Sequence, residues 1–164
     1  MAPSFTIRRA APSDSAGILA CLRAAFAPYQ GSYTPSGYED TILTAETLRG
    51  RFEFMSIFIA VSEAGEIVGT IGCNPVGGED GHLRGMAVLA EWQGTGVGDS
   101  LLESAENELR ALGCRRVTLD TTAPLRRAIR FYEKHGYRAT GNVADFFGMP
   151  LYEYAKPLHK AGRQ

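Results

Sequence analysis

The sequence predicts a mixed α/β fold, in which one sheet is covered by helices on both faces. Two patterns of the chain lead to this class. Residues 83–89 and 116–121 have the character of strands flanking a glycine-rich loop and a helix, and such a crossover requires a parallel strand pair. The strands expected at 56–61 and 67–73 are joined by a short turn at 63–66, which is typical of an antiparallel hairpin. A sheet with both pairings is mixed, and the helices between its strands cover its faces.

Local signals predict the elements of the N-terminal half. Alternating residues at 5–9 predict a first strand. Capping residues at 12–15 then begin a helix, because apolar residues recur after them at helical spacing. Residues 29–40 are rich in Gly, Ser, Pro and Tyr and predict a long loop, after which Thr44 caps a short helix at 45–49.

The last elements follow from similar signals. Pro124 opens a helix with one apolar face, and Gly136 ends it. Residues 137–140 and 149–156 predict two closing strands. The tail from residue 157 onward is expected to be loosely ordered.

The composition narrows the class of protein. With 45% hydrophobic and 10% aromatic residues, 164 residues can build one packed core, so we expect residues 1–164 to form a single domain. The formal net charge is −1, and because this offers no general attraction to polyanions, we expect no nucleic-acid partner. No apolar run of about 18 residues is present and the N-terminus lacks a signal-type segment, so we expect a cytoplasmic protein without a membrane partner.

Neither the cysteines nor the histidines indicate a metal site. The cysteines lie in apolar surroundings without a Cys-x-x-Cys spacing, so we expect buried free thiols at Cys21, Cys73 and Cys114. No histidine has metal-ligand spacing with another His or Cys, so we predict no metal cofactor.

The loop at residues 93–98, Gln-Gly-Thr-Gly-Val-Gly, is the most specific functional signal. Its alternate glycines remove side chains and expose backbone amides to an anion, and the helix that begins there directs its positive end to the same place. We therefore expect the loop to bind a pyrophosphate. Asp99 lies just beyond it and would repel a phosphate, so its side chain is expected to point away.

Two other interpretations of the loop are open. It could be a tight surface turn. A Rossmann dinucleotide site also places a glycine turn between strand and helix, and Asp120 ends the next strand as such a site requires. Against it, Asp99 occupies the third fingerprint position, and residues 89–93 separate the strand from the first glycine. A P-loop is excluded, because no Gly-Lys-Ser/Thr follows.

The chain resembles the GNAT superfamily of N-acetyltransferases, whose acetyl-CoA signature Q/R-x-x-G-x-G/A is matched by residues 93–98. Residues 83–92 are similar to the family's splayed strand, and residues 128–137 are similar to its second motif. The resemblance implies a GNAT-like acyl-CoA N-acyltransferase fold, with a mostly antiparallel central sheet and one parallel, splayed strand pair. It also implies an enzyme that moves an acetyl group from acetyl-CoA to a primary amine of a small-molecule acceptor, by direct attack in a ternary complex.

The same resemblance assigns residues to acetyl-CoA. Strand amides freed by the splay would bind the pantetheine arm, and the Val88 amide would polarise the thioester carbonyl. Arg127 would meet the phosphates, although solvated arginines on a helix face are the alternative. The coenzyme-binding residues expected are Met86, Ala87, Val88, Gln93, Gly94, Thr95, Gly96, Val97, Gly98, Arg127 and Phe131. Leu125 stands where the family often has an Asn, so one polar contact to the coenzyme is missing.

The resemblance also suggests two catalytic residues. Tyr132 occupies the family's tyrosine position, where a phenol that is protonated at neutral pH can donate to the coenzyme A thiolate; a tyrosine packed in the core is the alternative. His82 stands where the family often places a carboxylate and is the candidate general base. Glu79, Asp80 or a water chain could take that role instead, and His82 could be incidental.

The acceptor is left open by the sequence. Residues 29–40, the helix after Thr44 and residues 143–150 are expected to shape its site, because the family varies there. Five aromatic residues either line a pocket for a small amine or pack beneath the loop: Tyr29, Tyr33, Tyr38, Phe146 and Phe147. Three carboxylates either attract a cationic amine or are simply solvated: Glu39, Asp40 and Asp145.

A noncatalytic acyl-CoA sensor is the alternative from another class, since it needs the glycine loop but no group that handles protons. The presence of Tyr132 favours the enzyme. A homodimer is compatible with the family, and the strand at 149–156 is then expected to pair across the subunit boundary.

Overall fold

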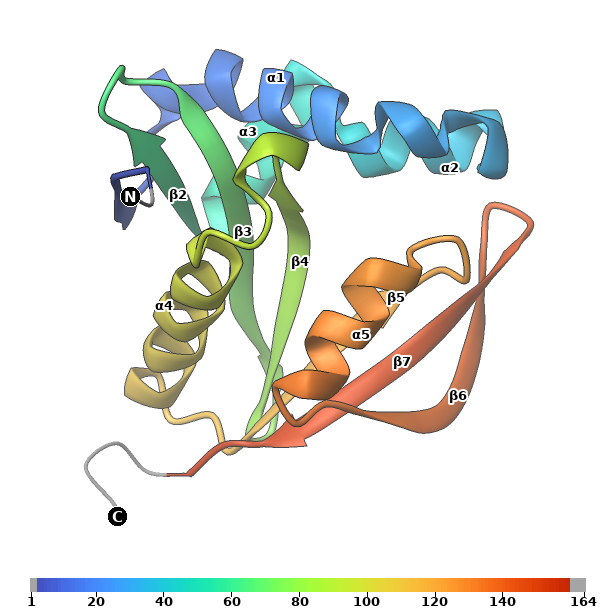
Figure 1. Ribbon diagram of the computed structural model, residues 1–164. Helices are drawn as coiled ribbons and strands as arrows, with labels where there is room; N and C mark the ends of the chain where they lie inside the picture. The colour runs from blue at the N-terminus through green and yellow to red at the C-terminus, as the bar shows by residue number, and fades with distance from the viewer. Residues whose placement is uncertain (1–2, 160–164) are drawn as a thin grey trace.

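One seven-stranded sheet runs through the protein in the order β1-β2-β3-β4-β5-β7-β6, in a computed structural model that describes residues 3–159 (Figure 1). Its strands are β1 (Phe5–Arg9), β2 (Ser56–Ser62), β3 (Ile67–Gly77), β4 (Asp80–Val88), β5 (Arg116–Thr121), β6 (Arg138–Phe146) and β7 (Met149–Pro157). β4 and β5 are parallel, and the other neighbouring pairs in this range are antiparallel. The predicted mixed sheet with one parallel pair is confirmed.

Helices cover both faces of the sheet, as predicted. They are α1 (Ser15–Phe26), α2 (Pro35–Ile42), α3 (Ala45–Phe54), α4 (Val97–Ala111) and α5 (Arg126–Lys134). Glycines in the strands allow close packing: a Cβ at Gly81 would lie 2.7 Å from Leu109 of α4, and on the other face a Cβ at Gly72 would lie 3.0 Å from Met55, which follows α3. None of the helices described is both long and apolar enough to cross a membrane.

The segment 29–40 is mostly helical, so the prediction of a long loop was wrong. A 3-10 helix spans Ala27–Ser32, and α2 follows it. The Thr34 hydroxyl accepts a hydrogen bond from the Gly37 amide at 3.2 Å, and Pro35 takes the first helical position, where its missing N–H costs nothing. These residues favour a loop when they are considered singly, but together they cap a helix.

The C-terminal strand is interior, and two predictions about this end of the chain were wrong. β7 pairs with β5 on one side and with β6 on the other, so it has no free edge for pairing with another subunit. The edge strand is β6, whose residues are almost all exposed. The chain is also ordered beyond residue 156, because buried Leu158 donates its amide to the Arg115 carbonyl at 2.7 Å. Residues 160–164 of the predicted loose tail lie outside the described residues.

The parallel pair is splayed. β4 and β5 pair only from Asp80 opposite Arg116 to Leu83 opposite Leu119, whereas β4 continues to residue 88. Figure 1 shows the two strands diverging toward the end of the sheet where α1 lies. A bulge accompanies the divergence: between Arg84 and Ala87, two residues of β4 stand opposite one residue of β3.

The first residue of the bulge, Gly85, has φ +65°, a backbone conformation that favours glycine. The bend therefore depends on a residue without a side chain.

The three cysteines are free and buried, as predicted. Burial raises the pKa of the Cys21 and Cys73 thiols to about 12, so both are neutral at physiological pH. These residues therefore act as small apolar core residues.

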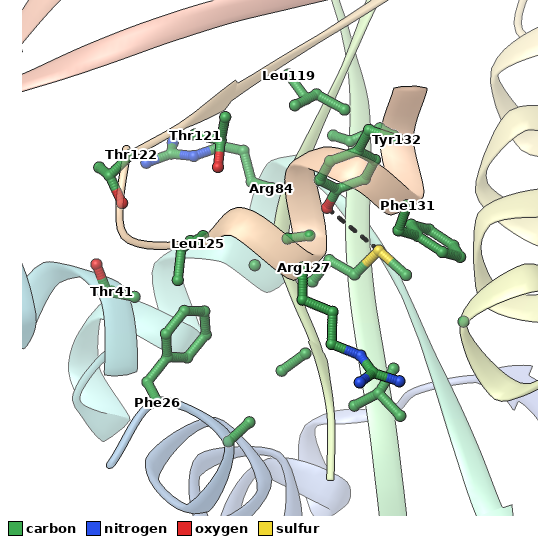
Figure 2. Close-up of a pocket in the computed structure, with 18 of the residues that line it drawn as sticks. Phe26, Thr41, Arg84, Leu119, Thr121, Thr122, Leu125, Arg127, Phe131 and Tyr132 are labelled. Carbon is green, nitrogen blue, oxygen red and sulfur yellow. Dashed lines mark hydrogen bonds between the residues drawn. The ribbon is translucent and has the colours of Figure 1, made fainter. Parts of the chain in front are cut away.

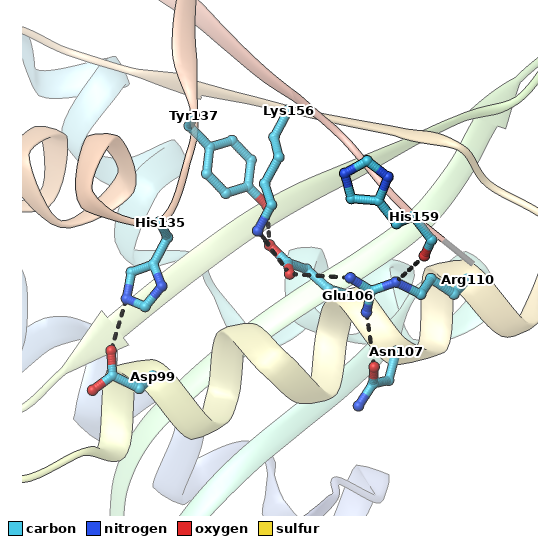
Figure 3. A network of polar contacts seen from close by, with 8 residues as sticks. All are labelled: Asp99, Glu106, Asn107, Arg110, His135, Tyr137, Lys156 and His159. Atoms are coloured by element: carbon cyan, nitrogen blue, oxygen red, sulfur yellow. Dashed lines mark hydrogen bonds and ion pairs between the residues drawn. The ribbon is translucent and has the colours of Figure 1, made fainter. Parts of the chain in front are cut away.

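A buried carboxylate ties α4 to the far side of the splay. Glu106 of α4 accepts hydrogen bonds from the Tyr137 hydroxyl at 2.7 Å and from Lys156 Nζ of β7 at 3.0 Å (Figure 3). Burial and the adjacent negative charge raise the pKa of Tyr137, so its hydroxyl is a donor at neutral pH. Since α4 also packs on β2 and β3, these contacts connect the two parts of the sheet that the splay separates.

Removing this carboxylate should destabilise the protein. We expect Glu106→Ala to lower the free energy of unfolding by about 3 kcal/mol, because it leaves the Lys156 ammonium and the Tyr137 hydroxyl without their acceptor. Urea unfolding measures the change. Glu103→Ala, at an exposed position of the same helix, is the control and should change stability by less than about 0.5 kcal/mol. Equal losses in the two variants would show that the buried contacts do not hold the helix.

Candidate functional site

A cavity of about 650 Å³ opens where β4 and β5 diverge (Figure 2). Its walls come from both sides of the splay: β4 and the loop after it, the end of β5, α5, and the segments around α1 to α3. Most of the residues predicted to bind the coenzyme lie on it: Met86, Ala87, Val88, Gln93, Gly94, Gly96, Gly98, Arg127 and Phe131. Thr95 and Val97 do not line it, and Val97 instead packs fully buried near Gly69.

The glycine loop presents free amides to this cavity. Gly94 and Gly96 have φ of +79° and +95°, so both positions favour glycine for their backbone conformation. Gly96 is the N-cap of α4, and the Ser100 amide closes the first turn by donating to the Gly96 carbonyl at 3.0 Å. The amides of residues 97–99 precede that bond and have no partner within the helix. The expected open first turn is thus present.

The outer edge of β4 is also free. The Leu89 amide donates to Val68 of β3 at 2.9 Å. Because successive backbone groups of a strand point to opposite sides, the Val88 amide is directed away from β3, into the splay. No strand pairs with β4 on that side beyond Leu83 among the described residues. The Gln93 side chain donates to the Val88 carbonyl at 3.4 Å, so Gln93 holds the end of the strand next to the loop.

Tyr132 reaches the cavity from α5. Its ring is buried between Phe131 and Tyr137, with ring centroids 5.6 and 5.8 Å away, and its hydroxyl donates to Met86 Sδ at 3.3 Å (Figure 2). Burial raises the pKa of Tyr132, so the phenol stays protonated. A thioether is a weak acceptor, and the hydroxyl can therefore exchange it for a better one. The two interpretations of this residue are compatible, since the ring packs while the hydroxyl faces the cavity.

α5 packs directly against the glycine loop. A Cβ at Gly98 would lie 3.3 Å from the Phe131 ring, so the third glycine of the loop permits the approach. Phe131 in turn stacks on His135, whose Nε2 lies 2.7 Å from Asp99 Oδ1 (Figure 3). Asp99 is thus held by His135. The N-terminus of α5 carries Leu125 and has no side-chain cap.

His82 lies on the cavity wall beside a carboxylate. Its Nδ1 is 2.6 Å from the Thr118 hydroxyl, and its Nε2 is 3.4 Å from Asp120 Oδ2. From the sequence, Asp120 was considered only as the acidic residue of a Rossmann site, and this pairing was missed. The parallel register explains the pairing of His82 with Asp120, because His82 stands opposite Thr118 and residue 120 shares the face of residue 118.

The other two candidate bases lie elsewhere. Glu79 pairs with Arg115 at 3.3 Å, and Asp80 pairs with Arg116 at 2.9 Å. Neither carboxylate lines the cavity. No group of three or more His, Cys, Asp or Glu side chains within residues 3–159 could hold a metal ion.

The remaining walls belong to the side of α1 to α3. Tyr29, Tyr33 and Phe146 line the cavity, whereas Tyr38 packs on Tyr33 and Phe147 is 51% exposed outside it. Among the three acidic residues considered for the acceptor, Asp40 lines the cavity, but Glu39 and Asp145 do not. Several other residues of this wall were not predicted from the sequence: Phe26, Arg51, Arg84, Thr121 and Thr122.

Comparisons with known proteins agree with this geometry. A sequence model of the acetyltransferase (GNAT) family matches residues 18–137. The uncharacterised protein YdhI of Bacillus subtilis (strain 168) is 36% identical over 81 residues, 49% of either protein, so the chain spans about half the length of this curated relative.

Solved structures share the fold at low identity. A GNAT acetyltransferase from Staphylococcus aureus Mu50 superposes with a TM-score of 0.78 at 17% identity, covering 95% of this chain and 100% of its own. The PaiA N-acetyltransferase of Thermoplasma acidophilum, in complex with coenzyme A, superposes with a TM-score of 0.77 at 20% identity, covering 94% of this chain and 99% of its own. The ribosomal-protein-S18-alanine N-acetyltransferase of Escherichia coli superposes with a TM-score of 0.75 at 20% identity, covering 98% of each chain. With the family match extending over most of its length, the chain belongs to the GNAT family of acetyltransferases.

Proposed function

We propose that the chain is an N-acetyltransferase that moves the acetyl group of acetyl-CoA to a primary amine of a small-molecule acceptor, and that it works as one catalytic domain. The observation that carries this proposal is the opening between β4 and β5 directly beside the glycine loop. Coenzyme A has a pyrophosphate and an arm with two amides, so it requires a cluster of N–H donors next to a free strand edge. The coenzyme A complex of the T. acidophilum relative supports the same use of the fold.

In this proposal, the amides of the glycine loop bind the pyrophosphate and Arg127 adds a positive charge to it. Figure 2 shows Arg127 extending from α5 into the cavity. The pantetheine lies along β4 beside Met86, Ala87 and Val88, and Phe131 closes the other side. Leu125 leaves the arm without the amide side chain that many relatives have there.

The chemistry is a direct attack in a ternary complex. The amine nitrogen bonds to the thioester carbonyl carbon, the Val88 amide stabilises the charge on the oxygen, and the carbon–sulfur bond breaks with its electron pair moving to sulfur. The Tyr132 hydroxyl protonates the thiolate, and the proton released by the amine passes to His82, whose imidazolium Asp120 stabilises. The Tyr132 phenolate then regains a proton from solvent, to which His82 releases its own. The products are the N-acetylated amine and coenzyme A.

An acyl-CoA sensor without catalysis would need the loop and the strand edge alone. The presence of Tyr132, His82 and Asp120 around the same cavity favours the enzyme. Incubation with acetyl-CoA and a panel of amines, with thiol release as the readout, distinguishes the two. A tight acetyl-CoA complex that acetylates no amine would favour the sensor.

The glycine loop can be tested against a matched glycine. Gly96 and Gly113 both have positive φ and open space around them, so alanine at either strains the backbone by about 1–2 kcal/mol. We expect Gly96→Ala to raise the dissociation constant of acetyl-CoA at least about tenfold, because the strain displaces the amides that bind phosphate. Gly113→Ala, at the other end of α4, should leave it unchanged. Calorimetric titration measures both, and equal affinities would exclude the loop from binding.

Removing the Tyr132 hydroxyl should slow catalysis without weakening binding. We expect Tyr132→Phe to lower kcat by about 10- to 1000-fold and to leave the affinity for acetyl-CoA nearly unchanged, because the ring keeps its packing. Tyr152→Phe, outside the cavity, is the control. An unchanged kcat for Tyr132→Phe at saturating amine would refute the role of this hydroxyl as the acid.

The fall in activity on removal of the proposed base should depend on pH. We expect His82→Gln to lower kcat/KM by about 100-fold at neutral pH, where the acceptor is an ammonium ion that must lose a proton. The loss should shrink above the pKa of the amine, because neutral amine is then available, whereas the loss in Tyr132→Phe should persist. Profiles of kcat/KM against pH for the parent protein, His82→Gln and Tyr132→Phe check this. A pH-independent loss in His82→Gln would count against His82 as the base.

A further inference from the structure

Two arginines from distant parts of the chain line the cavity. Arg84 follows Leu83, the last residue of β4 that pairs with β5, so it lies at the start of the splay. Arg51 comes from α3, and its Nη1 would lie 3.1 Å from a Cβ at Gly85. Both line the cavity, and neither has a salt bridge or a side-chain hydrogen bond to any residue between 3 and 159.

This lack of a partner is costly for a charge that is partly withdrawn from water. Burial, together with the positive charge of Arg84, lowers the pKa of Arg51 to about 10, while Asp40 opposes the shift. Arg51 therefore remains a cation at neutral pH, beside another cation. Other arginines of the protein, Arg9 and Arg116, each have a carboxylate within 3 Å, at 2.8 and 2.9 Å. A bound anion would supply the missing partner.

A hydroxyl on β5, the other strand of the splay, also lacks a hydrogen-bond partner. Thr121, two residues beyond the paired Leu119 of β5, has a buried Oγ1 without a hydrogen bond in the described part of the chain. Thr121 lines the same cavity as Arg84, and both side chains are labelled in Figure 2. An acceptor molecule bound between β4 and β5 can form this hydrogen bond.

The same cavity also carries negative charge. Asp120 and Asp40 line it, and Asp120 stands beside the proposed base His82. The walls between these charges are apolar and aromatic, including Phe26, Tyr29 and Phe146. The acceptor site therefore offers cations for an anion, carboxylates for an ammonium group and an apolar surface for the remainder.

We propose that the acceptor is an amino acid or a close analogue, a primary amine that carries a carboxylate, and that Arg51 and Arg84 bind this carboxylate while the amine faces His82 and Asp120. The guanidinium fork can bind a planar carboxylate through two parallel hydrogen bonds. This inference rests on the proposed function, because it names the class of amine that the transferase acetylates.

Matched acceptors test the carboxylate. L-phenylalanine, L-phenylalaninamide and phenethylamine share the amine and the apolar side chain but differ in the anion, as do L-leucine, L-leucinamide and isopentylamine. With thiol release as the readout, we expect kcat/KM for the carboxylate-bearing member to exceed that of its partners by about 100-fold, since two charge-assisted contacts are made. Aminophosphonate analogues distinguish a carboxylate site from a general anion site, and a preference for them would overturn the assignment to amino acids.

The failures of the two proposals can be separated. If amides and simple amines are acetylated as efficiently as amino acids, the proposed transferase activity is supported and the amino-acid assignment is overturned. If no amine is acetylated, the proposed function fails, and calorimetric titration of the same compounds into the protein saturated with coenzyme A decides this inference by itself. Binding of the amino acids but not of the amides would support it, and the absence of such a difference would overturn it.

Substitutions locate the effect. We expect Arg51→Gln and Arg84→Gln each to raise KM for the amino acid at least about tenfold, with kcat, the KM for acetyl-CoA and the activity toward the amide little changed. Arg49→Gln, at an exposed position of the same helix α3, is the matched control and should behave like the parent protein. Arg84 is exposed, so its variant serves if Arg51→Gln fails to fold. Equal losses for the carboxylate and amide acceptors would overturn the assignment.

Discussion

The bulge in β4 is the constraint on which the site depends. Gly85 and Met86 stand opposite a single residue of β3, and the parallel ladder to β5 ends just before them, at Leu83. If the ladder continued, the amides of β4 would be satisfied by β5, and the cavity would be filled by paired strands. A local irregularity of one residue thus changes a closed sheet into a binding site.

An opening of this kind must be supported from outside the ladder. α4 supplies one support, because Glu106 accepts hydrogen bonds from Tyr137 and Lys156 on the far side of the splay. α5 supplies another, because Phe131 rests on Gly98 and His135 pairs with Asp99. These contacts hold the glycine loop, Tyr132 and β4 in one arrangement. The groups that would contact acetyl-CoA are therefore preorganised before any ligand binds.

Charges are distributed unevenly around the cavity. In the proposed complex, backbone amides and Arg127 attract the phosphates of the coenzyme, while Arg51 and Arg84 line the same cavity as His82 and Asp120. Arg51 and Arg84 differ from Arg9 and Arg116, which each pair with a carboxylate. In the proposed acceptor complex, an anionic ligand supplies the missing partner and so contributes to specificity.

Much of the fold and part of the candidate site were predictable from the sequence. The hairpin, β5 and the glycine loop follow from local periodicity and from the conformational freedom of glycine, and such signals lie within a few neighbouring residues. The expectation that Tyr132 belongs to the site came from the resemblance to the GNAT family. By contrast, α2 was missed because its capping residues favour a loop when taken one by one. Three features join segments that are distant in the chain: the interior place of β7, the pairing of His82 with Asp120, and the presence of Arg51 and Arg84 on one cavity. Sheet order, strand register and the bulge decide these arrangements, so only the tertiary structure could bring these residues together.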